Sequence, residues 1–218
     1  MAGGYVVYGA EGSGSVAVEA ALTLAGAPYS LVEWRVGEAD AGPEIEQVNP
    51  QRQAPALLLP SGELMTESAA ILIHLAEAHP DARLGPPAGH PLRPRFLRWM
   101  SYISAQIYAL YWIRDDVRRL AADAAHEPVI LERTARRILD CWRMMDAQVR
   151  PEGRFLLGDE ASVLDLYLAV VSRWRPGREA FEAAAPGLAP IARAIDAHPG
   201  LADLWPRRFP FAGDEADA

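Results

Sequence analysis

The sequence contains no lysine, since all 21 of its basic residues are arginine. Without a lysine ammonium group the chain cannot form a Schiff base with a carbonyl substrate or build the phosphate-binding lysine of a P-loop. Cysteine is almost as scarce, with Cys141 the one thiol in 218 residues. An intrachain disulfide, a Cys-x-x-Cys redox pair and a cysteine-rich zinc site are therefore excluded.

Other absences narrow the class of protein further. The five histidines never fall at the i, i+4 spacing of a helical metal site, so we expect no bound metal. No apolar run approaches the roughly 18 residues of a membrane helix, and the N-terminus lacks the pattern of a signal peptide. A net charge of −8 argues against a nucleic-acid surface. We expect a cytoplasmic protein with neither a membrane nor a nucleic-acid partner.

The first eighty residues alternate between strand-like and helix-like patterns. The predicted order is strand, helix, strand, helix, strand, strand and helix, over residues 5–8, 16–25, 29–36, 43–48, 56–59, 63–65 and 66–79. The first three elements form a β-α-β unit, which implies parallel pairing of its two strands. Pro60-Ser61-Gly62 supplies the turn residues of a hairpin between the last two strands. This half is a small α/β layer.

Beyond residue 80 the sequence pattern changes from alternating strands and helices to a linker followed by helices. Residues 81–91 are rich in proline and glycine and suit a linker. The following residues, 92–212, show helical patterns and no convincing strand, and the acidic stretch 213–218 has the composition of a disordered tail. The predicted helices of this second half cover residues 92–120, 128–149, 162–172 and 188–197. The sequence thus predicts an α/β domain followed by an all-helical domain.

The glycine-rich stretch after the first strand is one candidate for chemistry. It places Ser13 and Ser15 where the next helix begins, and unpaired N–H groups and the helix dipole favour negative charge there. A thiolate ligand would be stabilised by that field and by a serine hydroxyl. The alternative is that either serine simply caps the helix.

Two more candidates follow in the same half. Pro55, in Gln53-Ala54-Pro55, enters a strand where a cis bond or an edge that pairs with an extended peptide is expected. Ser68 and the free N–H groups of the third helix can bind a carboxylate, and Glu67 can bind an ammonium group. Together these two residues would hold an α-amino acid head group, although a turn proline and a helix cap are the simpler interpretations.

The combination resembles the cytosolic, bacterial-type glutathione transferase family over nearly the whole chain. The shared features are the serine-bearing turn, Asn49-Pro50, Gln53-Ala54-Pro55 and Glu67-Ser68-Ala69-Ala70-Ile71 in the first half. In the second half, Leu157-Gly158 and the run from Ser162 to Asp165 resemble the family's capping box and buried aspartate, which we assign to folding. The resemblance implies a thioredoxin-like N-terminal domain and an all-helical C-terminal domain.

The resemblance also implies a function and a co-substrate, glutathione. Glu67 and Ser68 would hold its γ-glutamyl head, the backbone of Ala54 before a cis Pro55 would pair with its cysteinyl part, and Gln53 would add a polar contact. The enzyme would then present the thiolate to a small hydrophobic electrophile.

Three residues are candidates for the hydroxyl that activates the thiol, and a fourth alternative is that no side chain donates to it. The positions where family members often carry a catalytic serine or cysteine fall on Gly12 and Gly14, and Ser13 and Ser15 lie beside them. We favour Ser13 over Ser15, and Tyr8 at the end of the first strand is a third candidate.

A second site is expected in the helical domain, where the electrophile would lie against residues 92–120. Its candidate residues combine aromatic and amide groups: Tyr102, Gln106, Tyr108, Tyr111 and Trp112. Arg173-Trp174-Arg175 could bind an acidic substrate, although solvation or an ion pair is the simpler role. The family also implies a homodimer through the third helix and residues 92–120. The alternatives to conjugation are a glutathione-dependent isomerase or lyase, and a non-catalytic glutathione-binding or interaction module.

Overall fold

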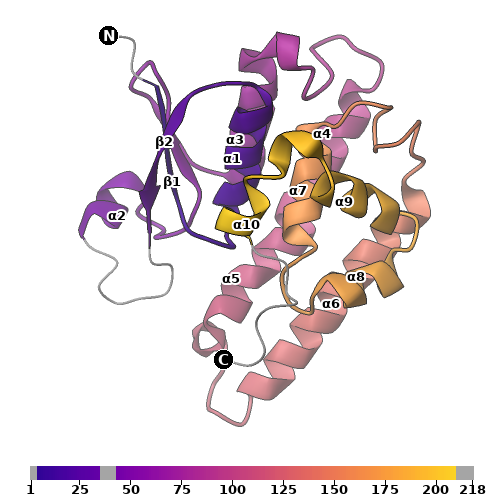
Figure 1. Cartoon of the computed structure of the whole chain (residues 1–218). Coiled ribbons are helices and arrows are strands. Elements are labelled where there is room, and N and C mark those ends of the chain that lie inside the picture. The colour runs from indigo at the N-terminus through magenta and orange to yellow at the C-terminus, as the bar shows by residue number, and fades with distance from the viewer. Residues whose placement is uncertain (1–3, 35–42, 210–218) are drawn as a thin grey trace. The chain divides into compact units, whose positions relative to one another are not determined.

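The computed structural model of the protein describes residues 4–34 and 43–209. Its contacts divide the chain into two compact units, one formed by residues 1–90 with 195–218 and the other by residues 91–194 (Figure 1). Residues from Ile195 on are thus grouped with the first unit, although the sequence places them in the helical domain that starts at residue 92. The predicted tail, 213–218, and the end of the predicted second strand, 35–36, lie outside the described residues.

The first unit is built on a four-stranded mixed sheet with the strand order β2-β1-β3-β4. The strands are β1 (Tyr5–Gly9), β2 (Tyr29–Glu33), β3 (Ala56–Leu58) and β4 (Leu64–Met65). β1 pairs with β2 in parallel and with β3 antiparallel, and β3 pairs with β4 antiparallel. This confirms the predicted β-α-β unit, the hairpin and the thioredoxin-like fold class. β3 is an interior strand and not the edge strand that was considered for Pro55, which lies just before its first residue.

Helices cover this sheet on both faces, as Figure 1 shows. They are α1 (Ser15–Leu24), α2 (Pro43–Val48) and α3 (Ser68–Ala78), and a 3-10 turn follows at Pro80–Ala82. Alternate residues of β1 point to opposite faces. Val7 is fully buried, whereas Tyr8, like Val48 of α2, packs against the buried pair Trp34 and Ala56.

The end of the described chain also belongs to this unit. A 3-10 turn at Pro199–Leu201 contacts α1, and the short helix α10 (Trp205–Arg208) follows it. The Trp205 side chain is buried and its indole N–H donates to the carbonyl of Ile195 at 3.3 Å. The sequence did not predict α10, because four residues are too short for a periodic pattern.

The described part of the second unit is helical. Its elements are α4 (Arg93–Tyr102), a π-helical turn (Ile103–Tyr108), α5 (Ala109–Asp115), a 3-10 turn (Val117–Arg119), α6 (Glu127–Gln148), α7 (Val163–Val171), α8 (Arg178–Ala184) and α9 (Ala189–Asp196), which ends just beyond the unit boundary. The helices predicted over 128–149, 162–172 and 188–197 are confirmed. The helix predicted over 92–120 instead contains a π-helical turn in its middle and ends at Asp115, because Asp116 is extended and a separate 3-10 turn follows. The short α8 was not predicted. None of the helices in the described ranges is long and apolar enough to cross a membrane.

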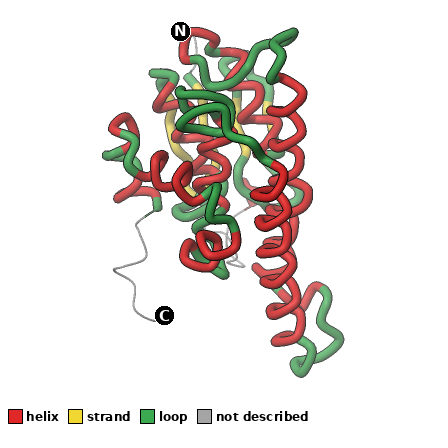
Figure 2. The backbone as a smooth tube through the Cα atoms, turned by 90° about the vertical axis from the view of Figure 1, so that its right-hand side faces the viewer, coloured by secondary structure: helices red, strands yellow, loops and turns green. Residues whose placement is uncertain are grey.

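The long helix α6 runs antiparallel to the α4–α5 segment, and Figure 2 shows the two side by side. As the residue number rises along the α4–α5 segment, the number of the hydrogen-bonded partner on α6 falls. The pairs are Arg98 with Gln148, Tyr102 with Cys141, Gln106 with Arg137, and Arg114 with Leu131. Ile103, Ile107 and Ile138 on these elements are buried, and Trp142 of α6 is buried against the ring of Phe181 of α8.

The predicted capping box at the start of α7 is confirmed. The carboxylate of Asp165 accepts hydrogen bonds from the Ser162 backbone N–H at 2.8 Å, from the Ser162 hydroxyl at 2.6 Å and from the Leu156 N–H at 2.9 Å. Asp165 is fully buried, so these donors have no access to water as an alternative partner. The motif therefore joins the preceding loop to the helix start.

We expect Asp165→Ala to lower the free energy of unfolding by about 2–4 kcal/mol, because the substitution removes the cap and leaves buried donors unpaired. Chemical denaturation measures the change. The matched control is Asp140→Ala, which removes an exposed carboxylate paired with Arg143 at the surface and should change stability little. An Asp165→Ala protein as stable as the control would contradict the structural role of this carboxylate.

Candidate functional site

Ser13 lies in a tight turn between β1 and α1. Its backbone N–H donates to the carbonyl of Ala10 at 3.1 Å, and its hydroxyl oxygen accepts from the N–H groups of Ala10 and Ser15, each at 3.2 Å. Its side chain is partly exposed beside the N-terminus of α1. Because both acceptor positions of the oxygen are occupied, the hydroxyl proton is the part of Ser13 left to donate.

Ser15 occupies a different environment, although it is only two residues away. It is fully buried, and its hydroxyl lies 3.0 Å from the carboxylate of Glu19, 3.2 Å from the carbonyl of Ala10 and 3.1 Å from the Ser13 hydroxyl. Ser15 therefore supports the turn from inside, whereas Ser13 borders solvent.

Glu19 and Arg208 belong to this site and were not found from the sequence. Glu19 is buried in α1 and paired with the Arg208 guanidinium. Burial raises the pKa of Glu19, while hydrogen bonds from Arg208 and Ser15 oppose that rise. Removing one partner of such a pair costs roughly 3–5 kcal/mol. The available signal was a lone acidic residue within the apolar pattern of residues 16–24.

Tyr8, the third candidate hydroxyl, is held in a small apolar cluster. Its ring lies 5.6 Å from that of Trp34, and Val48 and Ala54 pack with them. The Tyr8 side chain therefore packs against the same two buried residues, Trp34 and Ala56, as Val48 of α2 and Ala54, the residue before the cis proline.

The loop before β3 is organised by Asn49, which is buried. Its side-chain amide donates to the carbonyl of Gln53 at 2.7 Å, and its side-chain oxygen accepts from the Gln51 N–H at 3.0 Å. The Ala54–Pro55 peptide bond is cis, as the family resemblance implied. Gln53 and Ala54 are thus fixed in position at the entry to β3.

The start of α3 carries the other pair of candidates. Glu67 is the N-cap residue and is exposed, with φ of 65°, a conformation that costs a non-glycine residue about 1–3 kcal/mol and is concentrated at binding sites. Ser68 is the first residue of the helix and is 7% exposed. A strained backbone with a charged side chain next to a helix N-terminus is suited to binding an amino acid head group.

The five candidate residues for the electrophile do not form one cluster in the second unit. Tyr108 and Tyr111 meet the ring of Trp174 edge to face at 4.8 and 4.9 Å. Tyr102 donates instead to the carbonyl of Cys141, and Gln106 accepts from Arg137, so both face α6. Trp112 is 42% exposed and lies beneath the guanidinium of Arg119.

Two tyrosines of this unit, Tyr102 and Tyr111, have a raised pKa. Burial raises the pKa of Tyr102 to about 12, and burial also raises the pKa of Tyr111. The Tyr111 hydroxyl is buried and has no hydrogen-bond partner among the described residues. Both phenols are therefore neutral at physiological pH.

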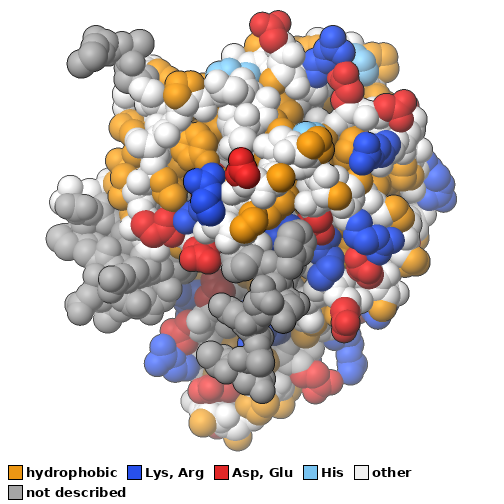
Figure 3. All heavy atoms as spheres, in the orientation of Figure 1, with side chains coloured by type: hydrophobic (Ala, Val, Ile, Leu, Met, Phe, Trp, Pro, Cys, Tyr) orange, Lys and Arg blue, Asp and Glu red, His pale blue; other side chains and the backbone are white. Residues whose placement is uncertain are grey.

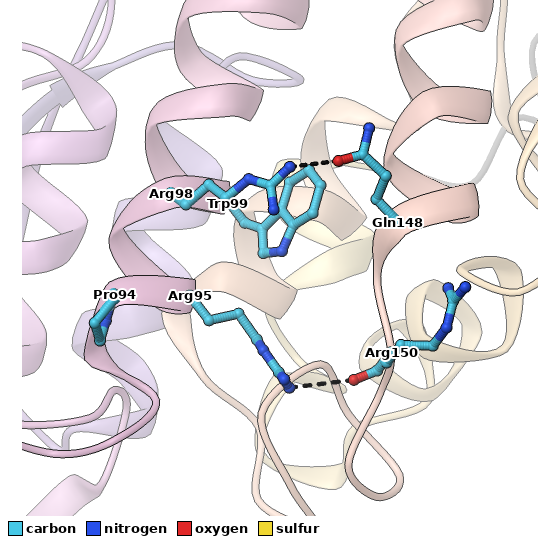
Figure 4. A pocket seen from close by; sticks show the side chains of 6 residues that line it. All are labelled: Pro94, Arg95, Arg98, Trp99, Gln148 and Arg150. Carbon is cyan, nitrogen blue, oxygen red and sulfur yellow. Dashed lines mark hydrogen bonds between the residues drawn. The ribbon is translucent and has the colours of Figure 1, made fainter.

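A polar pocket of about 340 Å³ lies elsewhere in this unit, between α4 and the end of α6 (Figure 4). Its lining residues are Pro94, Arg95, Arg98, Trp99, Gln148 and Arg150. Arg95 is paired with Glu152, and Arg98 donates to Gln148 and stacks on Trp99. None of the five electrophile candidates lines it.

On the face shown in Figure 3, arginine and acidic side chains are interspersed, and no large area carries charge of one sign.

Comparisons with known proteins define the family. Residues 7–87 match the model of the glutathione S-transferase N-terminal domain. The chain is 32% identical over 203 residues to the uncharacterized GST-like protein YncG of Escherichia coli K12, a match that covers 92% of this chain and 97% of that protein. The chain therefore belongs to the glutathione S-transferase family.

Solved structures agree with the fold. A sphingomonad glutathione S-transferase complexed with glutathione superposes with a TM-score of 0.72 at 28% identity, covering 91% of this chain and 96% of the other. A glutathione transferase homologue from Sulfitobacter with bound glutathione has a TM-score of 0.82 at 24% identity, covering 93% and 97%. These similarities span both units, which confirms the fold predicted from the sequence.

We expect Gly9→Ala to disturb the turn, because a Cβ at Gly9 would lie 2.2 Å from both Cβ and Oγ of the buried Ser15. Overpacking of this kind lowers the free energy of unfolding by about 1–3 kcal/mol. Gly4→Ala is the comparison, since its nearest neighbour would be the Pro28 carbonyl oxygen at 3.3 Å. Equal denaturation midpoints for the two variants would show that Ser15 is not held tightly against Gly9.

Proposed function

We propose that the protein is a glutathione transferase that conjugates the thiolate of glutathione to a small hydrophobic electrophile. The observation that carries the proposal is the start of α3, where the exposed Glu67 has a positive φ directly before the buried Ser68. The same unit contains the cis Ala54–Pro55 bond and the Ser13 turn. Relatives solved with glutathione support this choice of co-substrate.

In this proposal the γ-glutamyl head and the cysteinyl part of glutathione each have their own partners. Ser68 and the N–H groups of the helix start bind the γ-glutamyl carboxylate, and Glu67 binds the ammonium group. The Ala54 backbone pairs with the cysteinyl part, and Gln53 adds a polar contact. The sulfur then lies over the turn at Ser13.

Activation of the thiol requires a modest change in its ionisation. A free thiol has a pKa of about 8.5, and each unit of depression corresponds to about 1.4 kcal/mol. The Ser13 hydroxyl and the N-terminus of α1 together supply a depression of about one to two units. The thiolate attacks the electrophilic carbon, a carbon–sulfur bond forms, and the leaving group departs with the electron pair of its bond.

The electrophile is proposed to bind in the second unit, where Tyr108 and Tyr111 form an aromatic wall with Trp174. Trp174 was considered from the sequence only as part of an acidic-substrate site. Tyr102, Gln106 and Trp112 remain proposed pocket residues, although their observed partners lie on α6 or at the surface.

The proposal includes a homodimer that works in the cytoplasm, where thiols are kept reduced. The isologous contact would involve α3 and the α4–α5 segment. Light scattering at micromolar concentration should give twice the 23.8 kDa mass of the chain, and a monomer mass would refute the dimer.

A second candidate function is a glutathione-binding module without turnover. This function is favoured because the Ser13 hydroxyl is already hydrogen-bonded within its own turn, to the N–H groups of Ala10 and Ser15 and to the Ser15 hydroxyl. Bound glutathione with no conjugation, isomerisation or lyase activity on any electrophile of a broad panel would select this function over catalysis.

We expect Ser68→Ala to weaken glutathione binding about ten- to a hundredfold, because it removes a hydrogen bond to a charged group worth roughly 1.5–3 kcal/mol. Calorimetry measures the affinity. Ser61→Ala, in the turn between β3 and β4, is the matched control and should bind like the unmodified protein. Unchanged affinity in folded Ser68→Ala would remove the proposed head-group site.

We also expect Ser13→Ala to raise the pKa of the bound thiol while the affinity for glutathione stays similar, since the contacts at Glu67 and Ser68 remain. Ultraviolet titration of the thiolate in the complex measures this. In Tyr8→Phe the competing hydroxyl is lost and the titration should not move. A shift only in Tyr8→Phe, or only in Ser15→Ala, would assign activation to that residue, and no shift in any of the three would exclude hydroxyl activation.

A further inference from the structure

Arg208, in α10, contacts the Ser13 turn directly through its backbone, and its side chain contacts two carboxylates that are bonded to the turn. Its carbonyl accepts from the Gly12 N–H at 2.8 Å. Its side chain is 12% exposed and makes a bidentate contact with Glu19, with Nε 2.7 Å from Oε2 and Nη2 3.1 Å from Oε1. The guanidinium also donates through Nη1 to Oε2 of Glu33 at 2.9 Å.

Each carboxylate held by Arg208 is bonded in turn to the same short segment. Glu19 accepts from the Ser15 hydroxyl at 3.0 Å, and Glu33 accepts from the Glu11 N–H at 2.9 Å. One arginine side chain and its carbonyl therefore connect α10 with residues 11, 12 and 15 by three separate routes. Ser13 lies between these anchored positions.

This arrangement affects the direction of the Ser13 hydroxyl. Its oxygen is fixed by the N–H groups of Ala10 and Ser15, so its orientation follows the backbone of the turn. When Ser15 donates to Glu19, its oxygen is left to accept from Ser13 at 3.1 Å. A thiolate is a charged acceptor that competes for this Ser13 proton with a neutral hydroxyl.

We propose that Arg208 is a positioning residue for thiol activation: it holds the turn so that the Ser13 hydroxyl meets the sulfur of glutathione. This inference rests on the proposed function and extends it, since it gives the last helix of the described chain a role in the reaction. Packing of Trp205 and contact of the Pro199–Leu201 turn with α1 fix that helix in the same unit.

The test compares Arg208→Met and Arg208→Lys with Arg207→Met. Arg207 is the matched control, because it is exposed on the same helix and, within the described residues, its guanidinium donates to the nearby carbonyl of Asp203. A double variant, Glu19→Gln with Arg208→Gln, removes both charges and avoids leaving one buried carboxylate unpaired if Arg208→Met folds poorly. Three quantities are measured: amide hydrogen exchange at Glu11, Gly12 and Ser15 without glutathione, the thiolate titration in the complex, and the affinity for glutathione.

We expect exchange at the three amides to become about tenfold faster or more in Arg208→Met and in the double variant. The pKa of the bound thiol should rise in the same proteins, glutathione affinity should change little, Arg208→Lys should be intermediate, and Arg207→Met should match the unmodified protein. The pH profile of kcat/KM should shift upward with the thiol.

Unchanged amide exchange in both Arg208→Met and the double variant would overturn the inference. Faster exchange with an unmoved thiolate titration would also overturn it, because Arg208 would then stabilise the turn without influencing Ser13. If the unmodified protein binds no glutathione, the proposed function fails and thiol activation with it. If Arg208→Met binds glutathione normally and the pKa of the bound thiol is unchanged, the positioning role is refuted and the proposed function is not.

Discussion

The buried ion pair between Glu19 and Arg208 is the interaction on which the candidate site depends. Neither charge is stable in the interior without the other, so the pair requires α10 to lie against α1 within the first unit. The two residues are 189 positions apart in the chain. The conformation of a six-residue turn, 10–15, is consequently fixed by a helix at the far end of the described sequence.

The proposed function separates affinity from reactivity within the first unit. In it, the start of α3 binds the charged head of glutathione, while the turn before α1 supplies a hydroxyl and a helix N-terminus for the sulfur. Contacts to a non-reacting part of a substrate can supply binding free energy that positions the reacting atom. Under this proposal, a substitution in the turn would change the reactivity of the thiol without loss of glutathione binding.

Much of the fold could be predicted because its signals are local. The β-α-β unit, the hairpin around Pro60-Ser61-Gly62 and the capping box at Ser162 and Asp165 each depend on residues close together in sequence. The Glu19–Arg208 pair has no such signal. The electrophile candidates show a second limit of prediction from sequence. Helical spacing places Tyr102 with Gln106, and Tyr108 with Tyr111, on shared faces, but it does not reveal which face meets α6 and which meets Trp174.

The central claim is that glutathione binds in the first unit with its sulfur at the Ser13 turn. A crystal structure of the protein with glutathione tests this most directly, because sulfur is located without ambiguity in an electron-density map. The account predicts the γ-glutamyl head at Glu67 and Ser68 and the sulfur within hydrogen-bonding distance of the Ser13 hydroxyl oxygen. A sulfur placed against Tyr8, or glutathione bound away from α3, would contradict it.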